Sequence, residues 1–130
     1  MPGARTFEYA VLRVVPRVER GEFVNAGVIL YCRAAGFLDA AVELDRSRLL
    51  AIAPRADVAT IEAHLDGLVR VCRGGEGSGP IGALAQAERF KWLTSPRSTS
   101  LQVSEVHEGL CGDPAEALQD ALRTHVRREA

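Results

Sequence analysis

Two stretches near the amino terminus decide the fold: Phe7–Val15, FEYAVLRVV, and Phe23–Cys32, FVNAGVILYC. Both are rich in β-branched and aromatic residues, which favour extended backbone, and Pro16 ends the first stretch. Apolar residues occupy both sets of alternating positions, a pattern typical of interior strands whose two faces are covered. On the face of the first stretch that carries Phe7, Tyr9 and Val11, Arg13 is the polar exception. These stretches therefore predict two neighbouring strands at the centre of a sheet.

Two further strands are predicted, one directly after the second strand and one near the carboxyl terminus. The short link Arg33–Gly36 leads to a third strand, Phe37–Leu44, and short links favour antiparallel neighbours. A fourth strand with one wet face is predicted at Leu101–Val106, where apolar and polar residues alternate. Gly27, in the middle of the second strand, indicates a bulge or a close approach of two backbones. The expected fold is α+β: an antiparallel sheet of about four strands, beginning with a three-strand meander, packed against helices.

The clearest helix is predicted at Val58–Arg73, where apolar residues recur every three or four positions behind Asp57, a good N-cap residue. Other helices are predicted at Arg46–Ala53, from Pro80 to about Phe90, and behind the capping sequence Asp113–Glu116. We see no internal repeat and no composition shift. A single domain is therefore expected over residues 1–130, with its core at about 7–126.

Composition narrows the classes of function. The 130 residues are 47% hydrophobic, enough for a core that needs neither metal nor disulfide. The net charge of −1 gives no overall field that attracts nucleic acid, so nucleic-acid binding is disfavoured. Fifteen of the sixteen basic residues are arginine, which suits the recognition of anions. The favoured explanation is nevertheless the composition of a GC-rich bacterial genome.

The three cysteines are far apart in sequence, and no cysteine or histidine pair has the spacing of a zinc site. No apolar leader follows the initiating methionine, so a cytoplasmic location without membrane attachment is expected. The glycine-rich loop at 74–79 lacks the Lys-Ser/Thr of a phosphate-binding loop, so we expect no cofactor. The spacing of the cysteines and histidines leads us to expect no metal. His107 and Cys111 are expected in a surface loop with an unreactive thiol.

A first cluster of candidate binding residues lies around the link between the first two strands. It consists of Arg13, Arg20, Glu22 and Asn25. Arg20 and Glu22 are spaced to form an ion pair that fixes the loop. Asn25 is expected on the same strand face as Gly27, where a buried amide needs partners for both its oxygen and its NH₂ group. A role in fixing the loop backbone and a role in binding are equally supported.

A second cluster lies between residues 92 and 102. Its candidate residues are Trp92, Arg97, Ser98, Thr99 and Gln102. A guanidinium beside hydroxyls and backbone N–H groups is suited to a phosphate or carboxylate, and an exposed tryptophan is suited to stacking. The alternative is a turn whose hydroxyls cap its own backbone, with Trp92 anchored in the core. This structural alternative is the more common one.

Three stretches together resemble a known family: Phe7–Arg13, Arg20–Val28 and Trp92–Gln102. They are similar to the bacterial domain of unknown function 3037 family, over about residues 7–126. The RGEFVNAGV and WLTSPRST stretches are the specific ones. The resemblance implies no catalytic residue. It implies a protein partner, because members are sometimes encoded beside kinase-like proteins of the persistence-toxin type.

Two hypotheses follow for the function. The preferred one is a small non-enzymatic accessory domain that binds a protein partner, either a kinase-like protein or a second copy of itself, with Trp92 and its neighbouring arginines in the contact. The alternative is a domain that binds a small anion or nucleotide, and an enzyme is one form of this alternative. In that case Arg13, Arg20, Arg97 and Thr99 would share one pocket, and Glu22 would be the acid or base.

Overall fold

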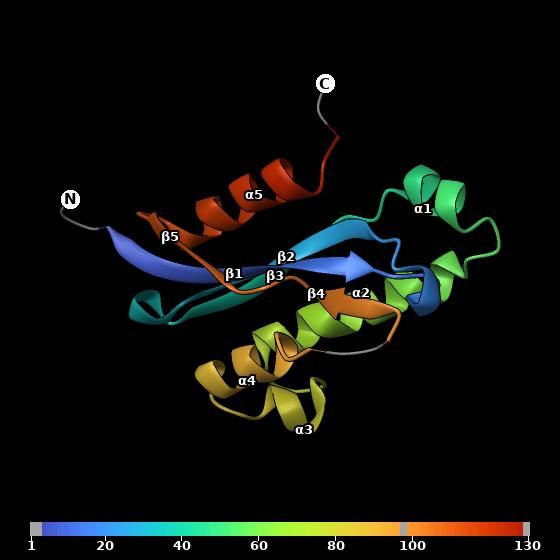
Figure 1. Ribbon diagram of the computed structural model, residues 1–130. Coiled ribbons are helices and arrows are strands. Elements are labelled where there is room, and N and C mark those ends of the chain that lie inside the picture. Colours follow the sequence, from blue (N-terminus) through green and yellow to red (C-terminus); the bar gives the residue numbers. More distant parts are fainter. Residues whose placement is uncertain (1–3, 97–98, 129–130) are drawn as a thin grey trace.

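The computed structural model describes residues 4–96 and 99–128 and contains a five-stranded antiparallel sheet (Figure 1). The strands are β1 (Arg5–Val14), β2 (Val24–Cys32), β3 (Phe37–Val42), β4 (Leu101–Val103) and β5 (His107–Cys111). Their order is β3-β2-β1-β4, and β5 also pairs with β1. β4 and β5 thus share one edge of β1, with β5 opposite Arg5–Tyr9 and β4 opposite Leu12–Val14. The predicted α+β class, antiparallel sheet and three-strand meander are confirmed.

The fourth predicted strand ends early, and a fifth strand was not predicted. Ser104, which is buried, interrupts the edge: its Oγ accepts a hydrogen bond from Val11 N at 2.8 Å and donates one to Glu105 O at 2.9 Å. Pairing with β1 resumes at β5. The expectation of a surface loop around His107 and Cys111 was therefore wrong. Its cause is that the sequence of β5, HEGLC, has no alternation of apolar and polar residues, whereas its pairing with β1 is a long-range contact.

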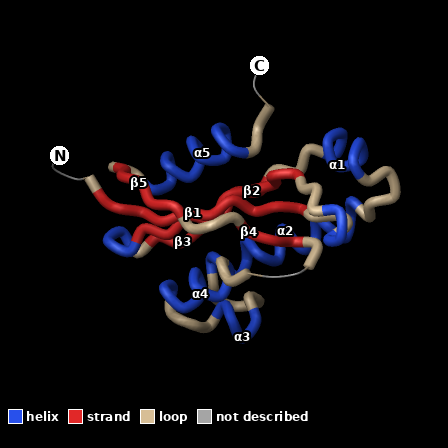
Figure 2. The backbone as a smooth tube through the Cα atoms, in the orientation of Figure 1, coloured by secondary structure: helices blue, strands red, loops and turns tan. Residues whose placement is uncertain are grey.

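Helices cover both faces of the sheet (Figure 2). On one face α5 (Pro114–His125) packs on β2 and β3, and on the other face lie α2 (Val58–Arg73) and α4 (Gln86–Leu93). β2 alternates between the two cores. Ile29 belongs to the α2 side with Leu65, and Leu30 belongs to the α5 side with Leu118. This division explains why β2 is apolar at nearly every position.

The segment predicted as one helix from Pro80 to about Phe90 forms two helices, so that prediction was wrong. α3 (Gly79–Gly82) and α4 are separated by three residues. Arg89 Nη1 donates to the carbonyl oxygens of Gly82 at 3.2 Å and of Leu84 at 2.9 Å. These bonds satisfy carbonyls that the break leaves without helical partners. A side chain several residues downstream therefore stabilises the break. The remaining helix, α1 (Arg46–Ile52), ends before Pro54, close to the predicted boundary.

The predicted N-cap of α2 is confirmed and has a consequence for the pH dependence of stability. Asp57 accepts hydrogen bonds from Thr60 Oγ1 at 2.8 Å and from Thr60 N at 3.1 Å, and these bonds lower the pKa of Asp57 below its ordinary value of 3.8. A carboxyl group whose pKa is lowered by folding stabilises the fold at neutral pH, and this contribution is lost as pH falls through the folded pKa. Asp57→Ala should therefore lower the Tm at pH 7. The difference from the wild type should shrink below pH 3.8 in thermal unfolding followed by circular dichroism.

Asp66→Ala is the matched control, because Asp66 is an exposed carboxylate in the interior of the same helix. Its Tm at pH 7 should stay close to that of the wild type. An equal loss of Tm in both variants would show that the cap contributes nothing beyond the charge.

Candidate functional site

Residues from the two sequence clusters meet in one row across the sheet. Arg13 of β1 lies opposite Asn25 of β2 on one side and opposite Gln102 of β4 on the other. The row lies on the α5 face, where α5 ends: Asn25 Nδ2 donates to the carbonyl oxygen of His125, the last residue of α5, at 3.0 Å. The structure thus brings together three candidate residues that are up to 89 positions apart in sequence.

A β-bulge creates this row. The pairing of β1 with β2 shifts between Leu12 and Arg13, so that Leu12 lies opposite Gly27 while Arg13 lies opposite Asn25. Successive residues of β1 face opposite sides of the sheet, and so Asn25 and Gly27 also face opposite sides. The expectation that they share one face was wrong for this reason. The bulge itself and the close backbone approach predicted from Gly27 are confirmed, because a Cβ atom there would lie 2.7 Å from Ala41 O.

The Arg13 guanidinium is the polar centre of the row. Its Cζ lies 4.4 Å from the ring centroid of Phe23, which is 45% exposed. Arg13 Nε and Asn25 Oδ1 are buried and have no hydrogen-bond partner among the described residues. None of the ion pairs in residues 4–96 and 99–128 includes Arg13. Buried polar atoms of this kind require an acceptor or donor from water or from a bound molecule.

Arg89 provides a comparison within the same chain. Arg13 and Arg89 are the described arginines that are partly buried, and the other described arginines are exposed. The Nε atoms of both arginines are buried without a hydrogen-bond partner among the described residues. Arg89 Nη1 nevertheless donates to two backbone carbonyl oxygens, whereas the Arg13 guanidinium contacts the face of Phe23. Phe23 was not among the candidate residues. Its position two residues before Asn25 was the available signal, because alternate residues of a strand share a face.

Arg20 and Glu22 form the predicted ion pair, which is confirmed. Arg20 Nε lies 2.5 Å from Glu22 Oε1, and this hydrogen bond raises the pKa of Arg20. Both side chains also line a small hollow with Pro16 and Ile52. Their charges compensate each other at the surface, so the pair fixes the loop and leaves no free guanidinium there.

Trp92 and Thr99 lie beside α2 and do not belong to the row of Arg13, Asn25 and Gln102. They line a shallow groove of about 560 Å³ along α2, together with Ala63, His64, Gly67, Leu68, Arg70, Val71, Ser100 and Leu101. Trp92 is 39% exposed, so the alternative that it anchors the core was wrong. Thr99 Oγ1 donates to Leu101 O at 2.8 Å, and Gln102 Nε2 donates to Thr99 O at 3.0 Å. The turn therefore binds its own backbone, and Thr99 and Arg20 line different hollows.

Two candidate residues, Arg97 and Ser98, lie outside the described residues. The structure therefore gives no position for the predicted guanidinium and hydroxyl of the second cluster. The neighbouring strand is nevertheless placed next to the first cluster, because Val15 N donates to Ser100 O at 2.7 Å.

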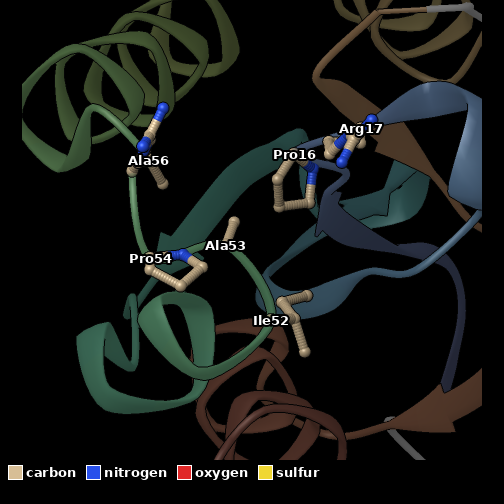
Figure 3. Close-up of a pocket in the computed structure, with 7 residues that line it drawn as sticks. Pro16, Arg17, Ile52, Ala53, Pro54 and Ala56 are labelled. Atoms are coloured by element: carbon tan, nitrogen blue, oxygen red, sulfur yellow. The ribbon is translucent and has the colours of Figure 1, made fainter.

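A separate apolar hollow of about 350 Å³ was not predicted (Figure 3). Pro16 and Arg17, just after β1, face the end of α1 and the link to α2 across it. The opposite wall consists of Ile52, Ala53, Pro54, Arg55 and Ala56. The sequence carried no signal for it beyond Pro54, since its two walls are brought together by tertiary packing.

The cysteines and acidic residues suggest no further chemistry. Burial raises the pKa of Cys72 to about 12, and burial is also the main cause of the raised pKa of Cys111, so both thiols are protonated at neutral pH. Within the described residues, His, Cys, Asp and Glu side chains form no group of three or more that could hold a metal ion. The helices in that part of the chain are all too short or too polar to cross a bilayer.

Comparison with known proteins agrees with the resemblance seen in the sequence. The profile of the family described as "Protein of unknown function (DUF3037)" matches residues 9–126. Comparisons with curated proteins and with solved structures give no significant match. The matched region contains the whole row of Asn25, Arg13 and Gln102 as well as both helical layers. Because this match covers nearly the whole chain, the protein belongs to the DUF3037 family.

Proposed function

We propose that this chain is a non-enzymatic accessory domain that binds a protein partner through Arg13, Phe23, Asn25 and Gln102, which we call the Arg13 patch. The observation that carries the proposal is the partly buried Arg13 guanidinium, which stacks on an exposed aromatic ring and has no carboxylate partner among the described residues. The partner would be a kinase-like protein, as the family resemblance implies, in the cytoplasm of a bacterium.

Arginine and aromatic residues at the centre of an interface contribute a large share of binding energy. The ring of Phe23 holds the guanidinium through a cation–π contact. The Arg13 side chain therefore loses less conformational entropy when it binds a partner. A planar guanidinium donates two parallel hydrogen bonds to the oxygens of a carboxylate. We therefore expect the partner to present an Asp, a Glu or a carboxyl terminus to Arg13.

The test compares two substitutions of the same kind, Arg13→Met and Arg33→Met. Arg33 is the control, because it is exposed in the short turn after β2 and belongs to another surface. Methionine keeps an apolar stem, and Tm measurements will establish that both variants fold. In affinity capture from cells that make this chain, we expect the wild type and Arg33→Met to recover the same stoichiometric protein. Arg13→Met should weaken that capture by about tenfold or more, the loss that truncation of a central arginine causes.

Equal capture by Arg13→Met and the wild type would overturn the role of the patch. Recovery of the chain alone, in repeated experiments with the wild type, would overturn the proposed function itself.

A second function is favoured by the same unpaired guanidinium: binding of a small anion or a nucleotide. The Arg13 guanidinium offers donors on this face of the sheet and has no carboxylate partner among the described residues, so a free phosphate or carboxylate is chemically suited to it. A ligand that binds only the folded state raises the Tm. A thermal-shift series with inorganic phosphate, citrate and ATP would favour this function if the Tm rises in the wild type and in Arg33→Met but not in Arg13→Met.

A further inference from the structure

The edges of the sheet are not equally protected. On β3, Asp39 Oδ1 accepts a hydrogen bond from Ala40 N at 2.8 Å and pairs with Arg73 Nε at 3.1 Å. On β4, the Thr99 hydroxyl occupies the carbonyl oxygen of Leu101. Side chains that occupy the outer backbone groups of a strand block the addition of another strand. Two of the three edge strands thus each have one outward backbone group that is occupied by a side chain.

β5 lacks such protection among the described residues. The odd-numbered residues of β1 direct their backbone groups toward this edge, since Val11 bonds with Ser104. Gly109 and His107 lie opposite Phe7 and Tyr9 and therefore face β1, so the backbone groups of Glu108 and Leu110 point outward. Among the described residues no hydrogen bond satisfies these outward groups, whereas one outward group is occupied on β3 and one on β4.

One side chain of β5 is largely uncovered. Leu110 is 74% exposed, the largest exposure among the large apolar residues of the described chain. Cys111, which faces the other side of the strand, packs against the core below α5. An open edge with an exposed leucine at its centre is a template for strand addition.

We propose that a second copy of this chain adds its own β5 to this edge, antiparallel, with the two-fold axis at Leu110. The two sheets would then form one ten-stranded sheet. The register follows from the sequence around the strand: Leu110 faces Leu110 of the second copy, and Glu108 faces Gly112, so that no carboxylate opposes another. Apolar cross-strand pairs stabilise such a ladder.

The neighbouring registers are less favourable. An axis at Glu108 places two carboxylates directly opposite each other, and like charges in that position are destabilising. An axis at Gly109 places Glu108 against Leu110 and removes the leucine pair. The strand therefore matches itself best around Leu110.

This interface is independent of the Arg13 patch. β5 pairs with residues 5–9 of β1, whereas Arg13 lies at the other end of the same strand, beside β4. A dimer formed through β5 leaves the patch available to a partner. Loss of dimerisation and loss of partner capture can therefore be measured separately.

The first test is sedimentation analysis of the full chain over a range of concentrations. We expect a reversible dimer for the wild type and for Leu50→Glu, whose exposed leucine belongs to α1. Leu110→Glu places two carboxylates opposite each other and should weaken dimerisation by about tenfold or more. A wild type that stays monomeric up to its solubility limit overturns the proposal, and so does a dimer that Leu110→Glu leaves unchanged.

The second test reports the register. Leu110→Cys in a Cys111→Ser background should give a disulfide-linked dimer on mild oxidation, because directly opposite residues bring their Cβ atoms close enough for that bond. Leu50→Cys in the same background should stay unlinked. In hydrogen exchange, the amides of Glu108 and Leu110 should exchange more slowly as the protein concentration rises. Linking at position 50 but not at position 110, or exchange that is independent of concentration, contradicts pairing through β5.

Discussion

Replacing Leu12 with alanine is expected to lower the free energy of unfolding by about 3 kcal/mol, within the range measured for buried leucines in other proteins. Leu12 is 1% exposed and lies on β1, which pairs with β2, β4 and β5. Its side chain belongs to the core between the sheet and α2, with Ile29 and Leu65. The cost has two parts, the lost burial of the leucine and the cavity that the fixed sheet cannot close. Urea denaturation at equilibrium measures the change.

Leu50→Ala is the control for this prediction, since Leu50 is 39% exposed in α1. Its free energy of unfolding should change by less than about 1 kcal/mol, as is usual for surface positions. Similar losses in both variants would mean that the core between the sheet and α2 is not the main source of stability.

The elements with strong local signals were predictable from the sequence. The helix Val58–Arg73 was predicted with both of its ends, because a capping Asp57 precedes it and Gly74 follows it. The first two strands were predicted to be interior ones, since both of their faces are apolar, and each has neighbours on both sides. In these segments the local pattern and the tertiary environment favour the same structure.

The failures arose where distant contacts decide the local structure. β5 is held by its pairing with β1, more than ninety residues earlier, and its own residues show no strand period. The break between α3 and α4 depends on Arg89, whose guanidinium binds the freed carbonyl oxygens. Neither contact leaves a periodic pattern in the sequence, so reading a window of neighbouring residues could not have found them.

The candidate site shows the same division. The sequence singled out Arg13 and Asn25 as polar residues in apolar strands, and Gln102 as a member of the second cluster. It did not predict that they form one row, because strand order and register are properties of the folded sheet. It also missed Phe23, since a cation–π contact with Arg13 requires the link between β1 and β2 to bring the ring over the guanidinium.

Gly27→Ala is expected to lower the free energy of unfolding by about 2–3 kcal/mol, because it forces atoms into a tightly packed place. The new Cβ would lie 2.7 Å from Ala41 O, 3.0 Å from Val42 Cγ1 and 3.1 Å from Leu12 Cδ1. The side-chain atoms of Val42 and Leu12 can move, but the closest atom belongs to the backbone of β3. Relief therefore requires β2 and β3 to move apart at the bulge.

The same substitution at Gly67 is the control and should have the opposite sign. Gly67 lies inside α2, and a Cβ there has no heavy atom within 4 Å. Alanine at such a position should raise the free energy of unfolding by up to about 1 kcal/mol through its helix propensity. In a Leu12→Ala background, Gly27→Ala should remain destabilising, because the clash with Ala41 O persists. If Leu12→Ala abolishes the effect, the constraint at Gly27 is a side-chain contact, and β2 can accept a side chain at the bulge without moving from β3.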